Sequence, residues 1–335
     1  MPDNATVTLP GMRRLPALAR LRDLALIPAI IVVAIVGQAV NPVFLEGGNI
    51  INVLQTMSEI AVMVLAETLV LVAGKMDLSL EATFGLAPGI AAWICLPAGG
   101  SAHGLGWLGG AWSVPLTLLV GLAIGLLNSL LIVRFGLSAF IVTLGMQITL
   151  HGMLTGISGG KTFFNLPSSM LYIGTAEWGG VPVSIWLCLV LFAAGVGVLG
   201  WTRAGRSLYA IGGNTDAAKA AGIRTDRVLW VAITTASVLA AVGGLMLTGR
   251  LASVAAAQGT GDIFTVFAAA VIGGVSLNGG KGTVFGAFTG ILLLYMIQNV
   301  LTLAGVPAQW IGAFNGAIIL VALILSRITS GKRQE

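Results

Sequence analysis

Charged residues are scarce in this chain of 335 residues, where Asp, Glu, Lys and Arg together make up 9% of the sequence. Soluble globular domains carry about 25% charged residues, so the composition excludes that class. Apolar residues account for 57% of the chain, and we therefore expect a protein that crosses a membrane several times. The 17 basic residues are spread over separate loops without interleaved aromatics, which gives no indication of a nucleic-acid partner.

Cysteine and histidine are also rare, with two residues of each. Cys95 and Cys188 both fall within apolar runs, so we expect no disulfide framework. Neither histidine has a partner at metal-ligand spacing. The segments TGISGGKT and NGGKGT resemble phosphate-binding loops, but Thr155 and Gly282 occupy positions where the motif requires other residues. The sequence therefore predicts no metal, no cofactor, no catalytic residue and no ATP hydrolysis by this chain.

Ten apolar runs are candidates to cross a bilayer as helices, which takes about 17–25 residues each. The third and the eighth are short and rich in glycine, which is typical of broken or tilted helices. The sequence therefore predicts an all-α, polytopic membrane protein with about ten transmembrane helices. The predicted spans are 24–40, 57–74, 83–98, 113–133, 138–157, 183–201, 228–249, 263–276, 284–302 and 310–326.

The distribution of basic residues predicts the orientation, because cytoplasmic loops accumulate Lys and Arg. If the N-terminus is inside, the ten spans leave only Lys161 and Arg250 of the 17 basic residues outside. We therefore expect a cytoplasmic N-terminal segment 1–23, a transmembrane domain 24–326 and a cytoplasmic tail 327–335. The polar loop 202–227 then lies in the cytoplasm.

That loop contains the pattern of a short helix over residues 214–222. Asn214 can accept a backbone hydrogen bond as the N-cap, Asp216 lies where the helix dipole favours an anion, and Gly222 supplies the C-terminal stop. Isolated helices shorter than about 12 residues are marginal in water. We therefore expect this helix to rest against a partner.

Three segments resemble, in order and spacing, signature regions of the ribose-type sugar permeases, the membrane subunits of bacterial ATP-binding-cassette importers. They are VAGKMDLS (72–79), GRSLYAIGGNTDAAKAAGI (205–223) and AAVIGGVSLNGGKGTVFGAFTG (269–290). The resemblance covers roughly residues 50–326 and implies a type II importer-like permease in the lipid of a bacterial inner membrane. The partners it implies are cytoplasmic ATPase subunits, a second permease subunit, and an extracytoplasmic binding protein that delivers a sugar.

By this resemblance, the loop helix is the coupling helix, which docks into a groove of the ATPase. We expect Gly205, Gly212 and Gly213 to let the chain turn tightly before that helix, and its alanines to allow close approach. The alternative, a helix lying on the bilayer surface, would need large apolar residues that the segment lacks. The positions that match the family are Arg206, Asn214, Ala217, Ala218 and Gly222, and Gly205 and Gly213 complete the set expected to couple to the ATPase.

Two departures from the family pattern involve charged residues. Where the family has G-G-I-D-L-S-V-G, this chain has Lys75 and Glu81 in place of two glycines, while Asp77 and Ser79 are retained. Asp77 and Ser79 either break a helix at the mouth of the pathway or cap the next span, with Asp77 paired to Lys75. Glu67 replaces an apolar residue in mid-span, at a cost of about 2.5–3.5 kcal/mol. We expect it to face the bundle interior, as a protonated contact between helices or as a partner of a sugar hydroxyl.

Two further sets of residues are candidates for the pathway or for helix packing. Polar residues spaced four apart in the fifth span, with two asparagines in the last spans, supply donors and acceptors for a passing polyol or hydrogen bonds between helices. These are Thr143, Gln147, His151, Thr155, Asn299 and Asn315. Glycines of the third segment are expected to let helices pack closely, namely Gly273, Gly274, Gly279, Gly280, Gly282 and Gly286. A pattern G-x-x-[DS]-L-[SN] at Gly74 and at Gly273 hints at an internal repeat.

Taken together, these patterns favour a permease subunit that forms the pathway for a monosaccharide or related polyol. A permease for branched-chain amino acids or nucleosides is an alternative within the superfamily, and an ion-coupled secondary transporter is an alternative of another class. The retained Asp77-Leu78-Ser79 favours a sugar over amino acids or nucleosides as the substrate. Dependence of uptake on ATP rather than on an ion gradient would distinguish an importer of this family from an ion-coupled transporter.

Overall fold

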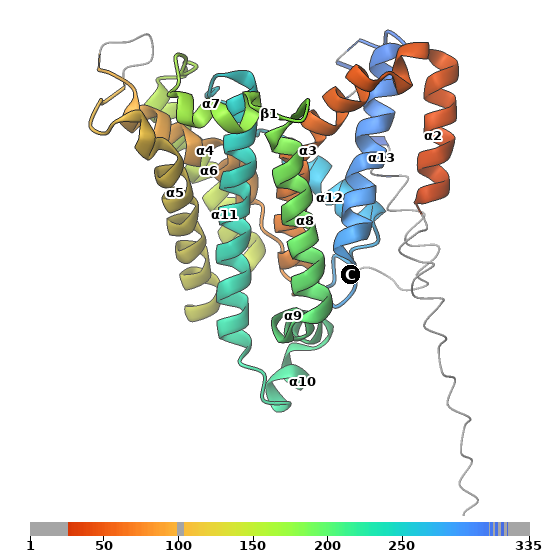
Figure 1. Ribbon diagram of the computed structural model, residues 1–335. Coiled ribbons are helices and arrows are strands. Elements are labelled where there is room, and N and C mark those ends of the chain that lie inside the picture. The colour runs from red at the N-terminus through yellow and green to blue at the C-terminus, as the bar shows by residue number, and fades with distance from the viewer. Residues whose placement is uncertain are drawn as a thin grey trace, which may run out of the picture.

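The structure is a helical bundle, known from a computed structural model that describes residues 26–98, 104–307 and scattered positions between 309 and 320 (Figure 1). Its elements are α2 (Ile27–Val40), η1 (Pro42–Leu45), α3 (Gly47–Val72), α4 (Ser79–Cys95), η2 (Gly110–Trp112), α5 (Ser113–Ser129), η3 (Leu130–Arg134), α6 (Ala139–Ser158), α7 (Ser168–Thr175), β1 (Glu177–Trp178), β2 (Val181–Pro182), α8 (Val183–Trp201), α9 (Arg203–Gly213), α10 (Thr215–Ala220), α11 (Thr225–Leu251), α12 (Asp262–Ile272) and α13 (Val284–Leu303).

Six segments of the described chain are long and apolar enough to cross a membrane: α3, the continuous run from η2 through α5 to η3, and α6, α8, α11 and α13. The exposed faces of the outer helices carry large aliphatic side chains, such as Ile35 on α2, Ile148 on α6 and Val190 on α8. Such a belt suits contact with lipid, because apolar side chains that face hydrocarbon avoid the free-energy cost of exposure to water. The all-α polytopic fold is confirmed.

The short third and eighth spans are found as the 17-residue helix α4, which contains Pro88, and the 11-residue helix α12. At 1.5 Å per residue, α12 is roughly 16 Å long, about half of a hydrocarbon core of about 30 Å. Both helices begin or end at a non-helical break in the bundle, which is tolerated at membrane depth only where protein or water surrounds it. The tenth predicted span, 310–326, lies largely outside the described residues.

Helix α3 forms the centre of the bundle, since every residue from Met57 to Val72 is buried. It packs against α8, α11, α12 and α13. The crossing of α11 over α4 is so close that a side chain at Gly244 would collide with the backbone of Phe84. Removing the side chain at such a crossing is the usual way for membrane helices to approach.

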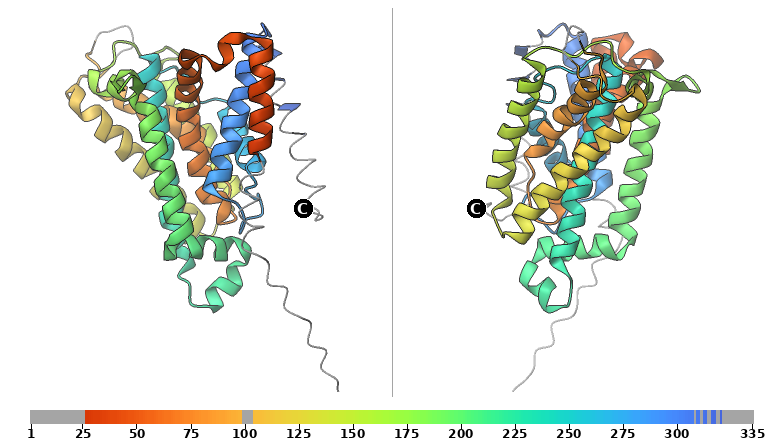
Figure 2. Two further views of the ribbon diagram at one scale, coloured as in Figure 1. Left: turned by 45° about the vertical axis from the view of Figure 1, so that its right-hand side comes forward. Right: turned by 90° about the vertical axis from the view of Figure 1, so that its left-hand side faces the viewer.

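The polar elements lie at the two ends of the bundle (Figures 1 and 2). At one end, α9 lies at the ends of α8 and α11 and α10 projects beyond them, and α7 with the β1–β2 hairpin lies at the other end. Backbone contacts of Gly74 and Gly280 with α9 place Lys75 and Lys281 near the first end. Arg250 follows Gly249, which contacts Gly174 of α7 at the opposite end. This separation agrees with the alternation predicted from charge, while the choice of cytoplasmic side stays a prediction.

The loop 202–227 contains two helices where the sequence indicated one. The N-cap of the predicted helix is confirmed, because Asn214 Oδ1 accepts from Ala217 N at 2.9 Å. The expectation of a tight turn at Gly205, Gly212 and Gly213 is wrong, since all three lie within α9. Thr202 begins α9 by accepting from Gly205 N at 3.1 Å.

Candidate functional site

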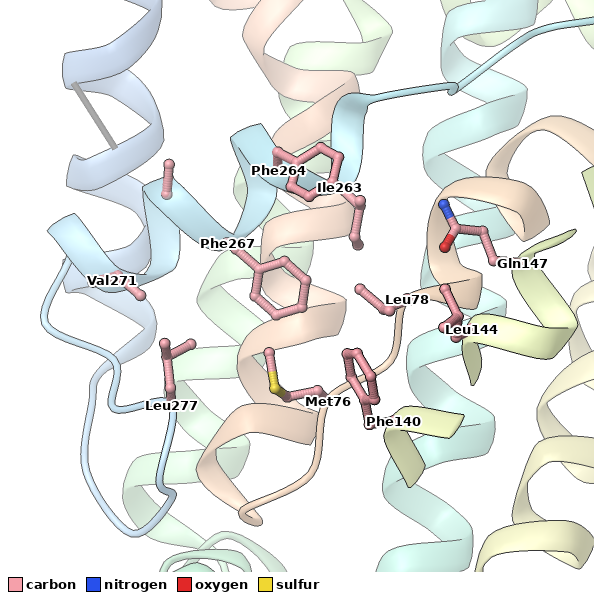
Figure 3. A pocket seen from close by; sticks show the side chains of 11 residues that line it. Met76, Leu78, Phe140, Leu144, Gln147, Ile263, Phe264, Phe267, Val271 and Leu277 are labelled. Carbon is pink, nitrogen blue, oxygen red and sulfur yellow. The ribbon is translucent and has the colours of Figure 1, made fainter. Parts of the chain in front are cut away.

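A cavity of about 430 Å³ opens between α6, α12 and the break that joins α3 to α4 (Figure 3). Its walls are almost entirely apolar, and Gln147 of α6 is the only polar side chain among those that line it. Two of its aromatic rings, Phe140 and Phe264, are also exposed at the surface of the chain. The lining residues are Met76, Leu78, Phe140, Leu144, Gln147, Ile263, Phe264, Phe267, Ala268, Val271 and Leu277.

The break between α3 and α4 is built by a glycine and an aspartate. Helix α3 ends with Gly74 in the left-handed region at φ +74°, and Lys75 N donates to Val70 O at 3.1 Å, which is a Schellman end. Asp77 Oδ1 accepts from Ser79 N at 2.9 Å and from Ser79 Oγ at 2.6 Å, so Asp77 starts α4. Within the described chain Asp77 makes no ion pair with Lys75. The capping role is therefore found without the expected pair to Lys75. The break supplies Met76 and Leu78 to the wall of the cavity, whereas Asp77 and Ser79 are not among its lining residues.

Glu67 faces the interior of the bundle and is fully buried on α3. Its Oε1 accepts from the backbone N–H of Asp77 at 3.3 Å, and its Oε2 has no hydrogen-bond partner among the described residues. Glu67 does not line the cavity. It stabilises the break between α3 and α4, and that break supplies lining residues to the cavity.

The polar stripe of α6 divides into separate contacts. Thr143 donates to Ala139 O of its own helix at 2.8 Å, Gln147 lines the cavity, and His151 Nδ1 lies 3.5 Å from Thr260 Oγ1. Asn299 instead exchanges two hydrogen bonds with Asn49, at 2.9 and 3.0 Å, and joins α13 to α3. Asn315 lies outside the described residues.

Glu81 is a site residue that sequence reasoning mentioned only as a departure from a pattern. Its Oε1 accepts from Gln147 Nε2 at 2.6 Å. Its Oε2 accepts from Gly261 N at 3.2 Å and Ile263 N at 3.0 Å, at the N-terminus of α12. The carboxylate therefore joins α4, α6 and α12 around the cavity. No short-range pattern announces this contact, because the residues lie 66 to 182 positions apart.

A second contact that the sequence did not indicate is the ion pair of Glu59 on α3 with Arg250 on α11. Nε and Nη2 of Arg250 donate to the two carboxylate oxygens of Glu59 at 2.5 and 3.0 Å. Glu59 is buried, so this bidentate pair neutralises a charge that would otherwise be costly in the bundle.

The break between α12 and α13 repeats the geometry of the first break. Gly274 lies at φ +82°, and Val275 N donates to Ala270 O at 2.9 Å, as in the Schellman end at Gly74. Gly74 is therefore structurally equivalent to Gly274. The sequence pattern G-x-x-[DS]-L-[SN] instead aligns Gly74 with Gly273, which is one position earlier. Gly273 and Gly286 instead face each other so closely that a side chain on either would collide with the other's backbone, which is the packing role expected for them.

The two breaks meet α9 in a contact made by backbone atoms, which we call the glycine junction: residues 72–74, 212–213 and 278–280. Gly280 N donates to Val72 O at 2.9 Å, and a side chain at Gly212 would collide with that same oxygen. A side chain at Gly279 would lie 2.6 Å from Gly74 Cα. Nearby, Tyr209 of α9 donates its hydroxyl to Gly282 O at 2.8 Å. Helix α9 is thus in direct contact with both breaks, and α10 follows it in the chain.

Helix α10 presents one face to solvent and one to the chain. Ala217 is exposed, whereas Ala218 is buried against the chain's own core. Gly222 ends the segment at φ +82°, and Arg206 of α9 donates to Trp201 O at 3.2 Å. Of the alanines expected to face a partner, Ala218 therefore points inward, while Ala217, Ala220 and Ala221 point outward.

Comparison with known proteins identifies the family and the relatives of the chain. Residues 49–323 match the protein family described as branched-chain amino acid transport system / permease component. The chain is 31% identical to the ribose import permease protein RbsC of Escherichia coli K12 over 96% of its length and 98% of that protein. It is 30% identical to RbsC of Haemophilus influenzae, over 92% and 93%. It is 32% identical to the autoinducer 2 import system permease protein LsrC of Klebsiella pneumoniae, over 91% and 86%. No solved structure matches the chain significantly.

Proposed function

The chain belongs to the permease component family of the branched-chain amino acid transport systems, and from that premise we propose that it forms the membrane pathway of an ATP-driven importer for a monosaccharide or related polyol. One observation carries the mechanism. Helix α9, which packs against α10, contacts both breaks at the glycine junction, and the same breaks supply Met76, Leu78 and Leu277 to the wall of the cavity. A movement of α9 therefore acts on the pathway without an intervening element.

The proposed substrate class follows from the relatives. Those named above import ribose and autoinducer 2, and the Asp-Leu-Ser sequence at 77–79 is retained in the break. The cavity suits passage rather than storage, because a wall with one polar side chain binds a hydroxylated solute weakly. A pathway must bind its solute weakly enough to release it.

We assign ATP hydrolysis to a separate ATPase chain that docks on α10 from the cytoplasm. The exposed surface of α10 combines the small residues Ala217 and Ala220 with the charged side chains of Asp216 and Lys219. The alanines allow the close approach of a groove. An extracytoplasmic binding protein would deliver the solute to the end that carries α7. A second permease copy or paralogue would cover the exposed rings of Phe140 and Phe264 beside the cavity.

The test is uptake of radiolabelled D-ribose, with leucine as the competing substrate class, into proteoliposomes that hold the permease with its ATPase and binding protein. We expect ribose uptake that requires ATP and persists when ion gradients are dissipated. Uptake of leucine in place of the sugar, or uptake that follows an ion gradient without ATP, would refute the proposal.

The docking assignment has its own test in Ala217→Arg, with Ala111→Arg in η2 at the opposite end as the matched control. Both side chains are exposed, so both variants should fold. We expect Ala217→Arg to lose co-purification with the ATPase and Ala111→Arg to retain it. Normal recovery of the ATPase with Ala217→Arg would remove α10 from the interface.

A further inference from the structure

The cavity contains one polar side chain whose orientation is set from behind. Gln147 is half-buried at one edge of the cavity, and the other labelled side chains around it are apolar (Figure 3). Its amide nitrogen donates to Glu81 Oε1 at 2.6 Å. Within the part of the chain that the structure describes, Gln147 makes no other hydrogen bond.

Glu81 accepts three hydrogen bonds in this arrangement. Its Oε2 receives the backbone N–H groups of Gly261 and Ile263 at the N-terminus of α12, where the helix dipole favours a negative charge. The NH₂ group of Gln147 therefore donates to Oε1, and the carbonyl oxygen of the same amide is left for the cavity.

From this geometry we infer that Glu81 is a positioning residue that fixes the amide oxygen of Gln147 toward the pathway, where it accepts a hydrogen bond from one hydroxyl of the passing sugar. The inference deepens the proposed function and rests on it. Since the rest of the wall is apolar, this oriented acceptor is the point at which the permease itself distinguishes a hydroxyl donor from a group of similar size that cannot donate.

Glu81 also anchors α12, so the test must separate orientation from stability. Glu81→Gln keeps a carbonyl oxygen for the backbone N–H groups of α12 but gains an NH₂ group. Gln147 can then turn its amide over, give its own oxygen to residue 81 and present its NH₂ group to the cavity. Gln147, the single polar side chain of the wall, then changes from an acceptor to a donor toward the cavity, while its size is unchanged.

The experiment measures ATP-driven initial uptake in proteoliposomes that hold the permease, its ATPase and its binding protein. The probe is the aldopentose or aldohexose that the wild type imports fastest, together with its analogues in which one hydroxyl is replaced by fluorine. Fluorine has nearly the size of a hydroxyl but donates no hydrogen bond. The quantity is the ratio of the two uptake rates, compared between variants so that the contribution of the binding protein cancels.

We expect one fluorinated analogue to be imported by the wild type roughly threefold to tenfold more slowly than the parent sugar, the range for one hydrogen bond. In Glu81→Gln and in Gln147→Leu this ratio should fall below about twofold. The control Leu144→Met changes an apolar lining residue and should keep the wild-type ratio.

Two results overturn the inference. One is an equal ratio of the two uptake rates in the wild type, Glu81→Gln and Gln147→Leu. This includes the case in which a variant imports the parent sugar and its fluorinated analogue more slowly by the same factor, which a purely structural role would give. The other is the absence of ATP-driven import of any sugar in the panel, which refutes the proposed function and the inference with it.

Discussion

Gly212→Ala is the sharpest test of the glycine junction. The added methyl group would collide with the Val72 carbonyl oxygen and lie 2.5 Å from Gly280 N. These two atoms share a hydrogen bond of 2.9 Å, so the methyl group has to separate the segments that the bond joins. Both neighbours are backbone atoms and cannot move aside by a change of rotamer.

The cost can be worked out from these contacts. Overpacking a tight site costs typically 1–3 kcal/mol, and the net loss of one hydrogen bond costs about 0.5–1.5 kcal/mol. Alanine is better than glycine in a helix by about 0.8–1.0 kcal/mol, which offsets part of this. We therefore expect Gly212→Ala to lower the free energy of unfolding by about 0.5–3.5 kcal/mol, measured by chemical unfolding of the permease in micelles.

The adjacent Gly213 provides the matched control, because nothing lies within 4 Å of a methyl group added there and the residue is still helical. Gly213→Ala should leave the free energy of unfolding unchanged or raise it by about 0.8–1.0 kcal/mol. In the complete importer, Gly212→Ala should also lower the number of sugars imported per ATP. Equal stability and equal coupling in the two variants would show that the segments are not joined as described.

Three further predictions address orientation and buried charge. A cysteine at Thr215 should resist an impermeant thiol reagent added outside the cell and one at Ser168 should react; the reverse pattern would invert the orientation. Glu67→Gln keeps an acceptor for the backbone N–H of the break, so its free energy of unfolding should stay within about 1 kcal/mol of the wild type. Glu67→Ala removes the acceptor and should lower the free energy of unfolding by about 1–3 kcal/mol. Equal losses for the two variants in chemical unfolding would contradict this role. Arg250→Met should cost about 3–5 kcal/mol by leaving Glu59 unpaired, and Glu59→Gln combined with it should restore most of that loss, so the absence of recovery in the double variant would count against the pair.

The membrane-length helices and the short third and eighth spans could be predicted because hydropathy and segment length decide them directly. The cap at Asn214 and the break at Asp77 could also be predicted, because each depends on a side chain that bonds within a few residues of itself. In both cases the physical cause lies in the local sequence. The break at Gly274 shows the limit of such patterns, since the visible echo pairs Gly74 with Gly273 and is one residue out of register.

Helix α9 was mistaken for a turn because its glycines were interpreted by their conformational freedom. Gly205 and Gly212 are instead helical and lie where a side chain would collide with backbone. For Gly212 this constraint is set by Val72 and Gly280, which are distant in the sequence. The carboxylate of Glu81 was missed as a site residue for the same reason. Its partners on α6 and α12 are brought to it only by the tertiary fold.

The glycine junction has a consequence for how such transporters diversify. Its contacts are made by the backbone at Val72, Gly212 and Gly280, whereas the side chains that would recognise an ATPase lie on the outer face of α10. On the proposed docking, recognition and transmission depend on different residues. Substitution of the exposed residues of α10, with the buried Ala218 kept, should change the ATPase partner and leave the glycine junction intact. A chimera that carries the α10 surface of another permease should keep its own substrate while depending on the foreign ATPase.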